Sequence, residues 1–171
     1  GNTILLKNMN NIAIVGTRGN SELGAKIAAK TAYSFVDYKY TIVSGLARGI
    51  DTAAHIGTLR NNGNTIAILT DLNKIYPSEN MSLANEILHK NGLLLSEIAP
   101  WKNIYRNAFV DRDRLQSGMS LGTFVIETDI IGGTMHTVKF TLDQNRHLFV
   151  PDISKLEYED GFSKINGIKH L

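Results

Sequence analysis

A glycine-rich loop with an arginine at its centre is the segment of this chain best suited to binding an anion. Residues 44–55 read SGLARGIDTAAH. Gly45 and Gly49 let backbone approach a ligand closely, and the helix that they open directs the positive end of its dipole outward. Arg48 can then bind a phosphate, while Asp51 orients the ligand or caps the helix. The candidate contacts here are Ser44, Gly45, Arg48, Gly49 and Asp51.

A second anion-accepting turn follows the first apolar run, at Gly16, Thr17 and Arg18. Its backbone amides could meet a phosphate at the start of a helix, with Arg18 adding charge. The glycines at 16, 19 and 24 do not fit the G-x-G-x-x-G spacing of a dinucleotide site, so we expect no nicotinamide cofactor. A tight strand-to-helix turn without a ligand explains the same residues equally well.

Two arginines stand close together in residues 99–120, a stretch without a clean hydrophobic period. If Arg112 and Arg114 both point inward, they could grip adjacent phosphates bidentately. The alternative is that they hold the segment by pairing with the nearby acids Asp111, Asp113 or Glu127. We expect this stretch to be the longest irregular connection of the chain.

A third glycine turn, Gly132, Gly133 and Thr134, follows the fifth apolar run and opens a helix. Successive backbone amides in such a turn form a concavity that accepts phosphates. A plain glycine turn with Thr134 as the helix cap is the alternative.

The other candidate residues favour ordinary structural roles. Trp101, Tyr105 and Phe109 recur at a spacing of four, which is more often a core stripe than a set of base-stacking rings. For His55 a packed position is favoured over a ligand contact. No histidine has metal-ligand spacing with acids, and no G-x-S-x-G elbow is present. The sequence therefore predicts no metal, no cofactor and no catalytic residue.

Short apolar runs alternate with segments of helical period along the chain. Strands are predicted at 11–15, 40–44, 65–69, 93–96, 123–126 and 147–150. Helices are predicted over 20–36, capped by Asn20 or Ser21, over 50–62 and over 83–88. Strands that are apolar on both faces and separated by helices indicate a parallel sheet. We therefore predict an α/β fold, a doubly wound, Rossmann-like sheet with helices on both faces and ligands at the carboxyl ends of its strands.

Composition restricts the partners. The 171 residues are 43% hydrophobic and carry a net charge of only +2, so any anion site must be local and not a basic coat. Cysteine is absent, and no run approaches the roughly 20 apolar residues of a membrane span. A cytoplasmic protein without membrane contact is expected. We assign residues 1–151 to one domain and 152–171 to a poorly ordered extension.

Ordered matches along most of the chain resemble the DprA/Smf family of DNA-processing proteins. The matching segments are Ile14–Arg18, Val43–Asp51 with Ala54 and His55, Gly63–Leu69, Tyr76–Asn80, Gly92–Glu97 and Val150–Pro151.

The resemblance implies a non-catalytic domain that binds single-stranded DNA in a basic pocket. It also implies a homodimer that helps to load a RecA-type recombinase during natural transformation. The family's pocket arginine maps to Arg48, its R-N-R segment to residues 112–114 and its S-G-S/T loop to residues 132–134, with Lys139 one helical step further on. Asp113 replaces the family's asparagine, and Asp152 stands where glycine is common.

The same pocket leaves two alternatives, a sensor of a small nucleotide and a nucleotide phosphoribohydrolase. Similar phosphoribohydrolases carry P-G-G-x-G-T-x-x-E, whose glutamate does acid/base work. Thr137 takes the place of that glutamate here, and Glu127 is the nearby carboxyl that could substitute. Loss of a general acid/base costs roughly 10²–10⁴ in rate, which favours a binding protein over an enzyme.

Overall fold

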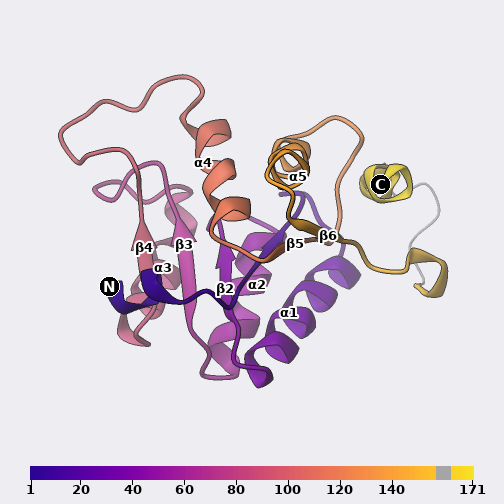
Figure 1. Cartoon of the computed structure of the whole chain (residues 1–171), viewed down its shortest axis with the longest axis horizontal. Coiled ribbons are helices and arrows are strands. Elements are labelled where there is room, and N and C mark those ends of the chain that lie inside the picture. Colours follow the sequence, from indigo (N-terminus) through magenta and orange to yellow (C-terminus); the bar gives the residue numbers. More distant parts are fainter. Residues whose placement is uncertain (157–162) are drawn as a thin grey trace.

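A computed structural model describes residues 1–156 and 163–171, and in them six strands form one parallel sheet (Figure 1). Its order is β4-β3-β2-β1-β5-β6. The strands are β1 (Asn11–Val15), β2 (Thr41–Ser44), β3 (Thr65–Ile68), β4 (Leu93–Leu95), β5 (Gly122–Val125) and β6 (His147–Phe149). Each predicted strand overlaps an observed one, and the predicted doubly wound α/β class is confirmed.

Helices cover both faces of the sheet. On one face α1 (Glu22–Asp37) packs beside α2 (Ile50–Arg60), and α3 (Met81–His89) packs next to α2. On the other face α4 (Ala108–Gly118) packs beside α5 (Thr134–Asp143). Buried strand residues alternate between the faces, so that Ala67 packs with α2 and α3 while Ile66 and Ile68 pack towards α4.

The predicted helix starts are close to the observed ones. Ser21 caps α1 by accepting a hydrogen bond from the Gly24 amide at 2.9 Å. Four 3₁₀ segments and the short helix α6 (Asn166–His170) add to the five main helices in the described residues. The 3₁₀ segments are η1 (Thr3–Lys7), η2 (Ser78–Asn80), η3 (Ile153–Lys155) and η4 (Ser163–Ile165).

The expectation of an irregular segment at 99–120 is wrong for its second half, which forms α4. The face that α4 buries consists of Ala108, Arg112, Gln116 and Ser117. These residues do recur at helical spacing, but most of them are polar, so no apolar stripe marks the helix in the sequence.

The C-terminal segment packs against the end of the sheet. Ile168, on the short helix α6 (Asn166–His170), is buried with Val15, Val125 and Val138. The Gly167 amide donates a 2.9 Å hydrogen bond to the carbonyl of Thr128. Residues 157–162, which belong to the extension expected to be poorly ordered, lie outside the described residues.

The order in which strands are added to the sheet reverses at β1: β2, β3 and β4 extend it on one side, and β5 and β6 on the other. At this switch point β1 and β5 pair through Val15 and Val125. In doubly wound sheets ligands bind at such a switch point, beyond the carboxyl ends of the strands. No helix in the described part of the chain is long and apolar enough to span a membrane.

Candidate functional site

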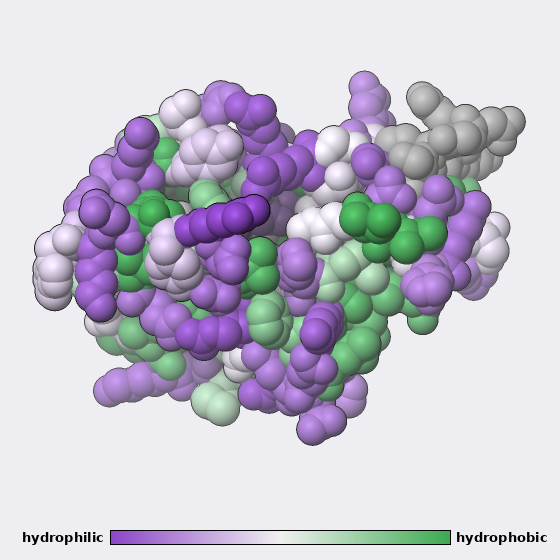
Figure 2. All heavy atoms as spheres, turned by 90° about the horizontal axis from the view of Figure 1, so that it is seen from above, coloured by the Kyte–Doolittle hydropathy of each residue, from purple (hydrophilic) through white to green (hydrophobic). Residues whose placement is uncertain are grey.

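A cavity of about 340 Å³ opens at the switch point, beyond the carboxyl ends of β1 and β5. Figure 2 looks down on this edge of the sheet, which is mostly hydrophilic with scattered apolar residues. The cavity is bounded by the turn after β1 (residues 15–18), by α4, and by the loop and helix that follow β5 (residues 128–137). Lys164 adds a cation from the C-terminal segment.

Three consecutive backbone amides at the start of α5 donate no hydrogen bond within the described part of the chain. The structure records none from the N–H groups of Gly132, Gly133 or Thr134 to any described residue. A side chain added at either glycine would meet nothing within 4 Å, so the turn is open to a ligand. Unpaired amides and the positive end of the dipole make this helix start suited to a phosphate.

The cations around the cavity differ in their partners. Arg18 is exposed, lines the cavity and forms no ion pair with the described residues. Lys164 lies 3.2 Å from a carboxylate oxygen of Asp129. Lys139 is exposed on α5, outside the cavity wall. Arg18 is therefore the guanidinium best placed to meet an anion at the α5 amides.

The turn after β1 uses some of its amides internally. The Thr17 N–H donates to the Glu127 carbonyl at 2.7 Å, and the Ile50 N–H donates to the Thr17 carbonyl at 3.3 Å. Gly49 has φ +80°, and a side chain there would lie 2.7 Å from Oδ1 of Asn20. Gly16, Thr17 and Gly49 thus bring the two glycine turns together beside the cavity.

Asp51 organises the loop after β2. Its Oδ2 accepts hydrogen bonds from the amides of Gly45 at 3.1 Å and Ala47 at 3.3 Å. Burial raises the pKa of Asp51, and the charge of Arg112 opposes that rise. Ser44 is also buried, and its hydroxyl donates to the Ile14 carbonyl at 2.7 Å. Asp51 therefore shapes this loop from within, and the Gly45 amide is already engaged.

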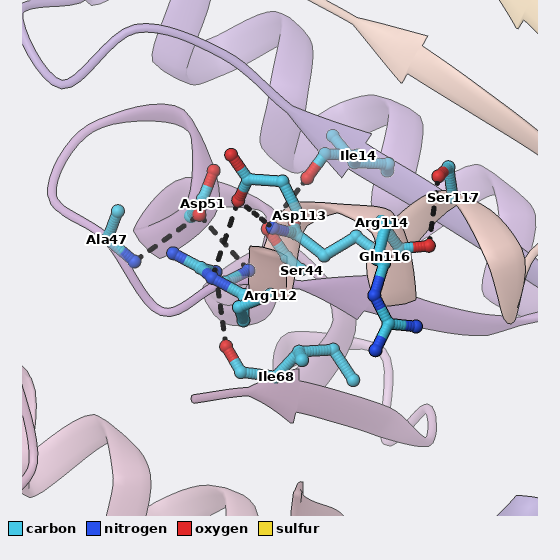
Figure 3. A network of polar contacts seen from close by, with 11 residues as sticks. Ile14, Ser44, Ala47, Asp51, Ile68, Arg112, Asp113, Arg114, Gln116 and Ser117 are labelled. Atoms are coloured by element: carbon cyan, nitrogen blue, oxygen red, sulfur yellow. Dashed lines mark hydrogen bonds and ion pairs between the residues drawn. The ribbon is translucent and has the colours of Figure 1, made fainter. Parts of the chain in front are cut away.

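Arg112 and Arg114 do not converge on one ligand position (Figure 3). Arg112 is buried, donates to the Ile68 carbonyl at 3.1 Å and lies 3.4 Å from Asp113, as the structural alternative anticipated. Arg114 points away from Arg112 and pairs with Glu97. Of the two, only Arg112 lines the cavity.

Arg48 stands apart from the main cavity. It is exposed, pairs with Glu79 and lines a small neighbouring hollow together with Arg18, Tyr76 and Phe109. Its guanidinium would have to leave Glu79 to bind a phosphate.

Asp113 places a carboxyl group in the cavity wall. Burial raises the pKa of Asp113 to about 7, although the neighbouring charge of Arg112 opposes the rise. Its Oδ1 accepts a 2.9 Å hydrogen bond from the side-chain amide of Gln116, whose own oxygen has no partner. The wall that α4 contributes to the cavity therefore offers hydrogen-bond acceptors, and its charge depends on pH near neutrality.

Glu127 has a structural role in this arrangement. Its side chain is fully buried and accepts hydrogen bonds from the Ser21 amide at 2.9 Å and the Ser21 hydroxyl at 2.5 Å. It does not line the cavity. The carboxyl considered as a substitute acid is thus occupied at the start of α1.

His55 is a packed core residue, as expected. Its ring is fully buried, and Nδ1 lies 2.8 Å from the Thr65 hydroxyl. Burial lowers the pKa of His55 to about 3, so the ring is neutral.

The aromatic residues expected in a core stripe are largely exposed, which corrects that interpretation. Trp101 is 84% and Tyr105 50% exposed, because the first half of residues 99–120 is not helical and crosses the surface. Phe109 is half-buried and meets the ring of Tyr76 edge to face, with centroids 5.6 Å apart.

Several cavity residues were not identified from the sequence, namely Ala47, Val110, Gln116, Thr128, Asp129, Ile131, His136 and Lys164. Those on α4 were missed because the helix itself was. Lys164 reaches the cavity through tertiary packing of the C-terminal segment, for which no local pattern exists. Ile131 and His136 lie close to the predicted glycine turn, and the i+3 and i+4 spacing of His136 from Gly133 and Gly132 would have indicated it. Among the described residues no group of acids and histidines could hold a metal ion.

Comparison of the sequence and fold with known proteins identifies the family of this chain. The DNA recombination-mediator protein A model matches residues 1–165. DNA processing protein DprA from Streptococcus pneumoniae is 37% identical over the whole chain. Its crystal structure superimposes with a TM-score of 0.85 at 32% identity, covering 99% of this chain and 58% of that one.

DNA processing protein A from Helicobacter pylori, studied for its single-stranded DNA binding mode, gives a TM-score of 0.85 at 27% identity. The match covers 99% of this chain and 74% of that one. The chain spans 58% of the length of the pneumococcal protein and 35% of protein Smf from Synechocystis. With one family model matching nearly its full length and the fold shared throughout, this chain belongs to the DNA recombination-mediator protein A (DprA/Smf) family.

Proposed function

We propose that the switch-point cavity binds the phosphodiester backbone of single-stranded DNA and that this domain is a non-catalytic DNA-processing module. The observation that carries the proposal is the set of amides at Gly132, Gly133 and Thr134, which donate no hydrogen bond to any described residue. These residues line the cavity together with Arg18, which forms no ion pair within the described ranges. The relative from Helicobacter pylori, a single-stranded DNA binder of the same fold, supports it.

In this proposal the contacts differ in kind. Gly132, Gly133 and Thr134 donate backbone hydrogen bonds to a phosphate, and Arg18 supplies charge. Gly16 and Thr17 shape the opposite wall. Arg48 and Lys139 contact the strand where it leaves the cavity. The remaining candidate residues do not contact DNA in this proposal, and they hold the loops and α4 in position. They are Ser44, Gly45, Gly49, Asp51, Arg112 and Arg114.

The salt dependence of binding tests this proposal. Fluorescence anisotropy with a labelled oligothymidylate, at low and at physiological salt, should show micromolar affinity with a shallow salt slope, because few phosphates are neutralised. Arg18→Ala should lower affinity about tenfold and reduce the slope by about one. Arg48→Ala should have a smaller effect, since Arg48 is already paired with Glu79.

Arg60→Ala is the matched control, because Arg60 is an exposed arginine at the far end of α2. It removes the same charge away from the cavity and should leave affinity nearly unchanged. Equal losses for Arg18→Ala and Arg60→Ala, or no binding at micromolar protein, would contradict the proposal.

The family role extends the proposal to partners. We infer that the domain works in the cytoplasm as a homodimer and helps to load a RecA-type recombinase on single strands taken up by the cell. Light scattering of the purified chain measures the dimer, and DNA-dependent ATP hydrolysis by the recombinase, with and without this protein, measures loading.

A small nucleotide is the second candidate ligand, favoured by the acceptor-rich wall of Asp113 and Gln116. A carboxylate and an amide oxygen suit the hydroxyl groups of a ribose, and about 340 Å³ is within the range of small-molecule sites. Ribonucleoside monophosphates that displace the oligothymidylate at equal concentration would favour this ligand. Release of free base, abolished by Asp113→Asn, would make the domain a phosphoribohydrolase.

A further inference from the structure

A second hollow of about 340 Å³ lies at the carboxyl edge of the sheet and shares two lining residues with the cavity. This second hollow, the outer groove, lies between the loop after β3 and the loop after β4. Arg18 and Phe109 line both hollows and also the small one beside Arg48, so the three meet at these two side chains. The remaining lining residues of the outer groove are Thr70, Asp71, Lys74, Tyr76 and Ile104.

The outer groove combines an aromatic surface with unpaired cations. Tyr76 is 55% exposed and is supported from the side by Phe109, while Ile104 is 42% exposed. Neither Arg18 nor Lys74 forms an ion pair with a described residue. A planar apolar surface next to free positive charge matches the two halves of a nucleotide, its base and its phosphate.

We propose that the outer groove binds the next nucleotides of the strand held in the cavity, with a base stacked on Tyr76 and a phosphate between Arg18 and Lys74. This inference rests on the proposed function, because the cavity supplies the first phosphate position. The strand then runs across the carboxyl ends of β3 and β4, and Arg18 lies where the two parts of its path meet.

Two features favour a nucleic acid over a protein in this groove. The loop that forms its outer wall carries the exposed residues Trp101, Lys102, Tyr105 and Arg106, an alternation of rings and cations typical of surfaces that bind single strands. The groove also borders the cavity, since Arg18 and Phe109 line both. Asp71 is the one carboxylate in its wall, and it accepts a hydrogen bond from the Asn73 amide at 2.8 Å.

Oligonucleotide length separates the outer groove from the cavity. A thymidine dinucleotide can fill the cavity alone, whereas an oligothymidylate of about twelve nucleotides reaches both parts of the site. Tyr76→Leu keeps an apolar side chain but removes the ring. It should weaken binding of the longer strand about tenfold, the loss of one stacked base, and leave the dinucleotide unchanged.

Lys74→Ala should likewise weaken only the longer strand and lower its salt slope by about one. Tyr38→Leu is the control, because Tyr38 is 76% exposed at the opposite end of α1. As an independent readout, the longer strand should quench the fluorescence of Trp101, the only tryptophan of the chain, and the dinucleotide should not.

The outcomes distinguish this inference from the proposed function. If neither Tyr76→Leu nor Lys74→Ala weakens binding of the longer strand, the proposal for the outer groove is wrong and the cavity proposal stands. Equal weakening of dinucleotide and longer strand by Tyr76→Leu also overturns it. If neither oligonucleotide binds the unaltered chain, both proposals fall.

Discussion

The guanidinium of Arg112 occupies the space that a side chain at Gly45 would fill. A Cβ at residue 45 would lie 2.7 Å from both Cζ of Arg112 and Oδ2 of Asp51, and it would overlap Nη1 of Arg112. Glycine is therefore required here by a neighbour on another element, because α4 inserts a cation against the turn after β2. This contact links the predicted anion loop to a helix more than sixty residues further along the chain.

Gly45→Ala should accordingly destabilise the fold. The methyl group displaces the Arg112 guanidinium from the Ile68 carbonyl and leaves buried polar groups without partners, a loss of about 3 kcal/mol or more. Urea denaturation measures the change. Gly19→Ala is the control, since a Cβ at Gly19 meets nothing within 4 Å, and its stability should change by less than about 1 kcal/mol.

Asp113→Asn should stabilise the protein in a pH-dependent way. Burial raises the pKa of Asp113 to about 7 from 3.8, so the folded state keeps a proton that the unfolded state loses between these values. The unaltered protein therefore loses stability as pH rises through this window, and asparagine does not. The gain should be absent near pH 4 and reach on the order of 4 kcal/mol above pH 7, because each unit of pKa shift corresponds to about 1.4 kcal/mol. Melting curves at several pH values measure it, and a gain independent of pH would contradict the assignment.

The sheet was predictable because its strands are short apolar runs separated by segments of helical period, and β1 and β2 end directly at glycine turns. The site was predictable only in part. Residues 132–134 and Arg18 were identified from local patterns and do lie together at the cavity. The helix α4 was not predicted, because it buries the polar residues Arg112 and Gln116 and so shows no apolar period in the sequence.

The missed helix also explains why the paired grip of Arg112 and Arg114 is not seen. At 3.6 residues per turn, side chains two positions apart point roughly 200° from each other. In an irregular loop both arginines could face one ligand, whereas on α4 one of them must face away when the other is buried. The placement of Lys164 was beyond prediction for a different reason, because only tertiary packing brings it to the cavity.

Glu127→Gln tests the structural role assigned to this carboxylate. One of its two acceptor oxygens becomes an amide group that cannot accept from the Ser21 N–H or hydroxyl, inside a fully buried site. We expect a loss of about 1–3 kcal/mol in the free energy of unfolding. Glu22→Gln, an exposed change in the first turn of the same helix, should cost little. If the two changes lower the free energy of unfolding equally, Glu127 does not stabilise the start of α1.

Asp113→Asn should also alter how DNA binding depends on pH. The carboxyl lies in the cavity wall near Arg18, so its ionisation places a negative charge close to the proposed phosphate position. Binding by the unaltered protein should weaken as pH rises through about 7, by roughly tenfold, because two like charges a few ångströms apart repel by about 1 kcal/mol or more. Asparagine keeps the acceptor for Gln116 but not the charge, so the affinity of the variant should stay level from pH 6 to about 8. Anisotropy titrations across this pH range measure the DNA affinity of both proteins. A variant that retains the full pH dependence would show that another group titrates at the phosphate site, and the acceptor wall would then have no part in anion binding.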